Sequence, residues 1–99
     1  MDLRAYEGTN IRAAHSGVVV FRDFGELYGL HIIVEYGDYE MLYAHLSAAY
    51  VLPGESVVAG EVIGLAGNTG RSHGAHLHFG LRYLGEWVNP APFLTDLTK

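Results

Sequence analysis

Apolar and polar residues alternate along several short segments of the chain, and glycine interrupts the stretches between them. Before Val88, no window of about eleven residues combines helical periodicity with an uninterrupted run of good helix formers. Several windows are instead rich in β-branched and aromatic residues, as strands are. The pattern predicts strands over residues 16–22, 28–36, 39–46, 56–58, 61–66, 75–83 and 86–88. We therefore expect a compact, all-β, antiparallel sandwich or barrel with glycine at its corners.

Two short links that contain glycine predict hairpins. Gly37-Asp38 joins the second and third predicted strands, and glycine takes the positive φ of a tight hairpin without steric cost. Leu84-Gly85 makes the same prediction for the last two strands. Only residues 93–98, which follow the last strand, are left for a short terminal helix. Each joined pair of strands should therefore be antiparallel neighbours.

The composition excludes several classes of protein. The 99 residues suffice for one domain over residues 1–99, and 49% hydrophobic against 17% charged residues excludes a disordered chain. A net charge of −5 with a single lysine provides no basic face for nucleic acid or an anionic membrane. No apolar run approaches the roughly twenty residues of a membrane span, and we expect no signal peptide in this chain.

The chain has no cysteine and six histidines. Thiolate metal sites, disulfides and cysteine nucleophiles are therefore excluded, and any metal or acid–base chemistry must use His, Asp and Glu. His76 and His78 lie two residues apart on a predicted strand whose intervening positions are apolar, so both point away from the core. At roughly 6 to 7 Å apart, they could form half of a zinc site or be two solvated surface histidines. Gly80 leaves space on the same face and favours a cleft.

The other four histidines have weaker claims on the sequence pattern alone. His45 ends a strand with two partly apolar faces, so a hydrogen-bonded structural role competes with a catalytic one. His31 is opposite the apolar positions of its strand and is expected to be solvated. His15 precedes a Ser-Gly turn, and His73 lies in the glycine-rich segment 67–74. That segment lacks the lysine and the following helix of a phosphate-binding loop, so we expect a rigid turn that presents His76 and His78.

Several short motifs occur in a specific order along nearly the whole chain. They are Ser16-Gly17-Val18-Val19, Tyr28-Gly29, Tyr43-Ala44-His45-Leu46-Ser47, Gly67-Asn68-Thr69-Gly70-Arg71-Ser72 and His76-Leu77-His78-Phe79. Together they resemble the lysostaphin and LytM type of zinc metallopeptidases. The resemblance implies two packed antiparallel sheets of the duplicated-hybrid-motif type, which biotinyl and lipoyl carriers share. It also implies a zinc endopeptidase that cuts peptide bonds of bacterial peptidoglycan.

The resemblance also assigns residues. In such enzymes a histidine and an aspartate in an H-x-x-x-D motif and the second histidine of H-x-H hold zinc. Carried over to this sequence, Asp2 and His78 match metal ligands, and His45 and His76 match the two catalytic histidines that do not bind the metal. The first ligand histidine would lie four residues before Asp2, so we expect an N-terminally truncated domain whose zinc is held weakly.

Three positions differ from the residues that the family more often shows. His73, Ala75 and Gly80 stand where threonine, proline and glutamate are common, and none of the three matches a metal ligand. The catalytic and ligand positions are therefore intact apart from the missing histidine.

The resemblance implies peptidoglycan stem peptides or cross-bridges as the substrate, and an extracellular, periplasmic or phage-associated location. Because the acidic chain is not attracted to an anionic wall, a further wall-targeting or phage-particle module is expected outside it. Two other functions stay open: a non-catalytic LytM-like module that binds or activates a wall hydrolase, and a phosphohistidine carrier. A lipoyl or biotinyl carrier needs a lysine on a hairpin, and the single lysine is Lys99.

Overall fold

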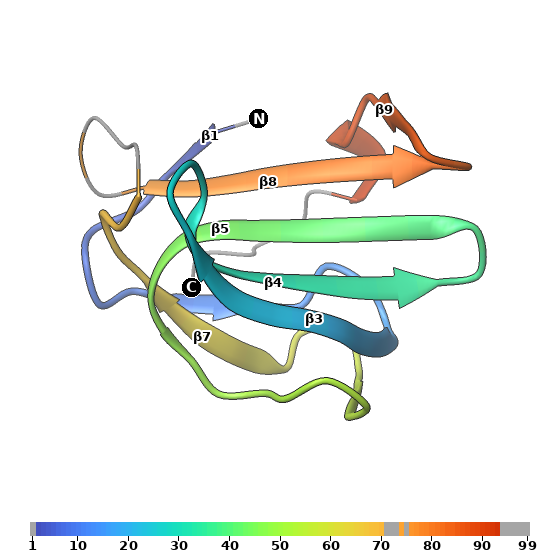
Figure 1. The fold of residues 1–99 in the computed structure, drawn as a ribbon, viewed down its shortest axis with the longest axis horizontal. Helices are drawn as coiled ribbons and strands as arrows, with labels where there is room; N and C mark the ends of the chain where they lie inside the picture. Colours follow the sequence, from blue (N-terminus) through green and yellow to red (C-terminus); the bar gives the residue numbers. More distant parts are fainter. Residues whose placement is uncertain (1, 71–73, 75, 94–99) are drawn as a thin grey trace.

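The computed structural model describes residues 2–70, 74 and 76–93 (Figure 1). These residues form nine strands and one short 3₁₀ helix. The strands are β1 (Asp2–Arg4), β2 (Asn10–Arg12), β3 (Gly17–Gly25), β4 (Gly29–Tyr36), β5 (Tyr39–Ala49), β6 (Ser56–Val57), β7 (Val62–Ala66), β8 (His76–Tyr83) and β9 (Glu86–Val88), and the helix is Ala91–Phe93. The predicted all-β fold is confirmed, and no helix among the described residues has the length and apolar character needed to cross a membrane.

Each predicted strand overlaps an observed one, and both predicted hairpins are present. Tyr36 pairs with Tyr39 across the first turn, and Tyr83 pairs with Glu86 across the second. The sequence pattern missed β1 and β2, which have three residues each and, unlike β9, are not joined to a predicted strand by a two-residue turn. The helix predicted over 93–98 falls, apart from Phe93, outside the described residues.

All strand pairs are antiparallel, and the main path of the sheet runs β1-β8-β5-β4-β3-β6. β8, β5, β4 and β3 run side by side (Figure 1). β5 pairs with β8 as far as Ala44, and from Leu46 onward it pairs with β7, which in turn pairs with β2. The expected two layers are thus present, and β5 joins them into one curled sheet.

The core lies between these layers. Apolar side chains from β3, β4, β5 and β8 meet those from β2 and β7, and the largest that are fully buried are Tyr43, Phe79, Ile11, Ile32, Met41, Leu46, Ile63 and Leu77. The Tyr43 hydroxyl accepts a hydrogen bond from the Ala14 N–H at 2.9 Å, which satisfies a polar atom inside this core. Burial raises the pKa of the Tyr43 phenol well above its usual value, so it stays protonated.

The prediction that His31 is solvated is wrong. Its exposure is only 9%, because the rings of Phe21 and Tyr28 lie 5.0 Å and 5.5 Å from it. Its Nδ1 donates to the Gly29 carbonyl at 2.9 Å. β4 is an inner strand, so its polar face is covered by neighbouring side chains that the alternation pattern does not reveal.

Gly29 is where the segment that contains Thr69 packs against the start of β4. Its φ of +62° favours glycine, and a Cβ there would lie 2.6 Å from the Gly70 nitrogen and also overlap Thr69. Both the backbone conformation and the close approach therefore require glycine at this position.

We predict that Gly29→Ala destabilises the fold much more than Gly37→Ala. The two glycines have nearly the same φ, but a Cβ at Gly37 meets nothing within 4 Å. Gly37→Ala should cost about 1 to 2 kcal/mol of unfolding free energy from backbone strain alone. Gly29→Ala should lose a further 1 to 3 kcal/mol from overpacking, measured by urea unfolding. Equal losses in the two variants would contradict this account of Gly29.

Candidate active site

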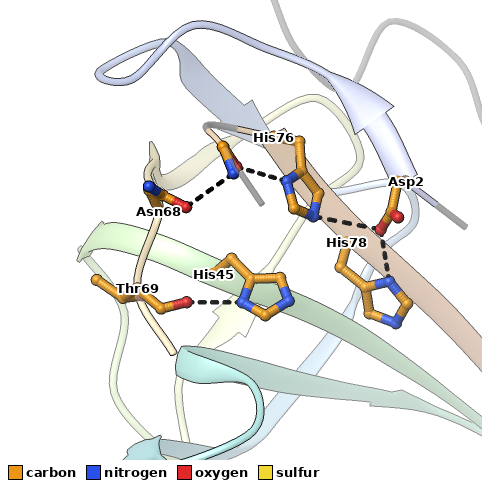
Figure 2. A network of polar contacts seen from close by, with 7 residues as sticks. Asp2, His45, Asn68, Thr69, His76 and His78 are labelled. Atoms are coloured by element: carbon orange, nitrogen blue, oxygen red, sulfur yellow. Dashed lines mark hydrogen bonds and ion pairs between the residues drawn. The ribbon is translucent and has the colours of Figure 1, made fainter. Parts of the chain in front are cut away.

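Four polar side chains from three strands meet on the outer face of the sheet (Figure 2). His76 and His78 belong to β8, and the intervening Leu77 is fully buried, so the predicted shared face of the two histidines is confirmed. β1 pairs with β8 in a register that sets Asp2 opposite His78. His45 comes from β5, the neighbour of β8 on its other edge. Asp2, His45, His76 and His78 thus form one cluster, as the sequence analysis expected.

His45 reaches this cluster through an unusual backbone conformation. The alternation along β5 would put it with Met41 and Tyr43, which are buried in the core. Its φ of +62° turns the side chain away from that face. The ring centroid of His45 lies 5.1 Å from that of His76 and 6.0 Å from that of His78. The sequence did not indicate how exposed His45 is. Its exposed fraction is 6%, so the residue is almost covered.

Backbone carbonyl groups fix the orientation of two of the histidines. His45 Nδ1 donates to the Thr69 carbonyl at 2.7 Å, and His76 Nδ1 donates to the Gly74 carbonyl at 2.7 Å (Figure 2). A carbonyl oxygen can only accept, so each neutral ring carries its proton on Nδ1 and its lone pair on Nε2. Both rings are therefore held in the tautomer in which Nε2 can accept a proton.

The glycine-rich segment 67–74 supplies these carbonyl groups. The Asn68 side-chain oxygen accepts the Gly74 N–H at 3.2 Å, which steadies the residue that holds His76. The described residues of this segment thus position His76, as expected, and also His45, which the sequence analysis did not foresee. Residues 71–73, His73 among them, lie outside the described part of the chain.

Asp2 makes the closest polar contacts within the cluster. Its Oδ1 lies 2.8 Å from His78 Nδ1 and 3.4 Å from His76 Nε2. The hydrogen bond from His78 holds the pKa of the Asp2 carboxyl below its usual value, with the nearby histidines as smaller causes. Burial lowers the pKa of His45, so this ring stays neutral at neutral pH. The cluster therefore combines a carboxylate with a neutral imidazole.

Asp2 and His78 have the donor atoms that zinc prefers. Two ligands of a tetrahedral zinc ion are about 3.3 Å apart, close to the 2.8 Å that separates Asp2 Oδ1 from His78 Nδ1. A metal would take the place of the proton between these atoms. No group of three or more His, Cys, Asp or Glu residues suited to a metal occurs within the described ranges. The residues thus fit part of a zinc site, and further ligands would have to complete it.

Tyr28 is a residue of the site whose role the sequence pattern did not indicate. It precedes β4, and its ring stacks on His78 with the centroids 6.0 Å apart and the planes 15° apart. His15 packs against Tyr36 at 4.2 Å and also contacts Phe93, away from the cluster.

Curated proteins of known name are similar to this chain in sequence. The DD-carboxypeptidase/endopeptidase Mpg of Neisseria meningitidis serogroup B is 44% identical over 106 residues, which cover 100% of this chain and 24% of Mpg. The murein hydrolase activator EnvC of Escherichia coli is 39% identical over 95 residues, which cover 95% of this chain and 23% of EnvC. The chain thus spans about a quarter of the length of these curated relatives.

A solved structure is also similar to this chain. The catalytic domain of lysostaphin, an antimicrobial peptidase of Staphylococcus simulans, superposes with a TM-score of 0.87 at 32% identity, over 93% of this chain and 74% of that domain. The profile of peptidase family M23 matches residues 1–90. On this evidence, the chain belongs to peptidase family M23.

Proposed function

We propose that this chain is the peptidase domain of a zinc-dependent endopeptidase that hydrolyses peptide bonds of bacterial peptidoglycan. The observation that carries the proposal is the convergence of Asp2, His45, His76 and His78 from three strands on one face. The name of its relative Mpg, a DD-carboxypeptidase/endopeptidase, supports the same chemistry. A domain without catalysis would have no physical reason to combine a carboxylate with three oriented imidazoles.

In this proposal Asp2 and His78 hold the metal, together with ligands beyond the two. Zinc, when bound, supplies Lewis acidity that polarises the scissile carbonyl and lowers the pKa of a water. Tyr28 packs on His78 and restrains the orientation of that ring. The hydrogen bonds that the other two histidines donate to the Thr69 and Gly74 carbonyl groups preorganise the rest of the site.

His45 and His76 act as the acid–base pair. When neutral, each ring has its lone pair on Nε2, so it can take the proton of the attacking water and later return it to the leaving amine. The lowered pKa of His45 keeps that ring neutral and able to accept the proton at neutral pH. In its protonated state, the same ring can stabilise the negative charge that develops on the carbonyl oxygen.

The second candidate function is a non-catalytic module that binds or activates a wall hydrolase. The relative EnvC, named a murein hydrolase activator, favours it. Either function acts on the peptidoglycan side of a membrane or from a phage particle. The net charge of −5 supplies no attraction to an anionic wall, so another module would provide the targeting.

Zinc binding by the 99-residue chain is expected to be substoichiometric after dialysis, because two protein ligands bind zinc much more weakly than three. Asp2→Asn and His78→Ala should each lower the zinc content further. His15→Ala, a histidine outside the cluster, should leave it unchanged. Elemental analysis measures the metal per chain. One tightly held zinc in the unaltered chain would contradict the two-ligand assignment.

Adding a strand upstream that sets a histidine four residues before Asp2 is expected to produce stoichiometric zinc binding and peptidoglycan hydrolysis. In that protein, His45→Ala or His76→Ala should reduce hydrolysis roughly 100- to 10,000-fold with zinc retained. His78→Ala should lose both, and a chelator should abolish hydrolysis. His15→Ala is the control and should change neither.

Release of soluble fragments from several types of peptidoglycan measures this activity. Full zinc occupancy with hydrolysis at background on all of them would contradict the peptidase proposal. The activator function would then replace it.

A further inference from the structure

We infer that Trp87 forms the specificity-determining wall of a substrate subsite beside His78, and that this subsite takes an uncharged alanine residue of a peptide. The inference rests on the proposed function and deepens it, because it names the part of the peptide that the site selects. It is carried by the packing of Trp87, Gly80 and Arg82 and by the hollow that these residues border.

Trp87 lies on the same face of the sheet as the histidine cluster. It belongs to β9 and pairs directly with Arg82 of β8, so the two side chains share a face. Positions two apart on β8 also share a face, which connects Arg82 through Gly80 to His78 and His76. Trp87 is 56% exposed, so much of the indole is available to a ligand.

The indole occupies the space that a side chain at position 80 would fill. A Cβ at Gly80 would lie 2.6 Å from Trp87 Cζ3 and 3.3 Å from Cη2. The φ of Gly80 is outside the left-handed region, so glycine is required here for space and not for backbone conformation. The indole therefore forms an aromatic wall where position 80 has no side chain.

Arg82 and Glu40 hold the indole in place. The Arg82 guanidinium lies 5.2 Å from the centroid of the Trp87 ring, a cation–π distance. Its Nη2 also contacts Glu40 Oε1 at 3.1 Å. The pair fixes the orientation of Trp87, and the two charges offset each other. The indole is thus oriented by these contacts, and the pair adds no net charge to the wall.

Two hollows lie between Trp87 and Tyr28. The larger, of about 330 Å³, is bordered by Tyr28, His78, Gly80, Trp87, Val88 and Pro90 among others. The smaller, of about 100 Å³, shares Tyr28 and Trp87 and reaches Glu40 and Arg82. The two aromatic residues are therefore the common walls of a groove that begins at the proposed metal ligand His78.

The chemistry of the larger hollow selects the occupant. Its border is aromatic and aliphatic, and His78 is the one titratable group besides the Tyr28 phenol that the described lining contains. Burying an unpaired carboxylate or ammonium against such surfaces is costly, whereas a methyl group gains from them. Peptidoglycan stem peptides carry both kinds of residue. An alanine of the peptide therefore fits this subsite, and the acidic and diamino residues do not.

Intrinsic fluorescence tests the inference directly, because Trp87 is the single tryptophan of the chain. The 99-residue protein is titrated, in the presence of a chelator, with a synthetic stem pentapeptide that ends in D-Ala-D-Ala. We expect a saturable blue shift of the emission, since the peptide covers the exposed indole. A matched peptide with D-Glu in place of both terminal alanines should bind at least tenfold more weakly. Equal affinity for the two peptides, or no shift at millimolar peptide, would overturn the inference.

A double-mutant cycle, in which calorimetry measures peptide binding, distinguishes a direct contact of the Trp87 indole from a general loss of protein stability. Trp87→Ala should weaken binding of the alanine peptide roughly tenfold. Gly80→Ala should weaken it as well by displacing the indole, yet should have no further effect in the Trp87→Ala background. Tyr50→Ala, at an aromatic residue that is also 56% exposed, is the control and should bind normally. Unchanged binding in Trp87→Ala would overturn the inference.

Failure of this inference and failure of the proposed function are distinguishable. The titrations use metal-free protein, so they need no hydrolysis. Selective binding that depends on Trp87 supports the subsite even if the extended protein hydrolyses nothing. Hydrolysis by the extended protein with the same kcat/KM before and after Trp87→Ala would uphold the peptidase and overturn the subsite.

Discussion

The left-handed backbone at His45 is the constraint on which both the fold and the site depend. A residue with a side chain costs roughly 1 to 2 kcal/mol in this conformation, so the surroundings must hold it there. The Tyr28 carbonyl accepts the His45 N–H at 2.8 Å, and the Thr69 carbonyl accepts its ring proton at 2.7 Å. At this point β5 leaves β8 for β7, so the residue that turns the strand between the layers also presents the imidazole.

Thr69 links that bend to the rest of the sheet. Its hydroxyl donates to the Leu46 carbonyl at 2.7 Å and accepts the Leu30 N–H at 3.1 Å, while its own carbonyl holds His45. The close approach of this segment to Gly29 makes these contacts possible. The orientation of the His45 ring is thus set by backbone carbonyl groups of two other segments, at Tyr28 and Thr69. Such a site is preorganised without long flexible side chains as supports.

The sequence predicted much of this molecule because its strongest signals are local. The alternation around His76 and His78 gave their shared face, and the glycine turns gave two hairpins. The position of His45 could not be read from a period of two, since a positive φ at histidine breaks that period. The burial of His31 could not be predicted either, because it depends on rings from other segments. The strand that carries Asp2 was missed because no short turn links it to a predicted strand. The resemblance to a family, rather than periodicity, assigned His45 and Asp2 to the site.

β1 adds a thermodynamic link between strand docking and ligand binding. It pairs with β8 through three residues, and Leu3 is its one partly buried contact with the core among these residues. A strand held by so few contacts opens locally at a small cost in free energy. Asp2 meets His78 only while the strand is closed, so an ion that binds both residues must make opening less favourable. Hydrogen exchange at β1 would therefore slow as the ion binds, and the first strand of the chain would report the occupancy of the site.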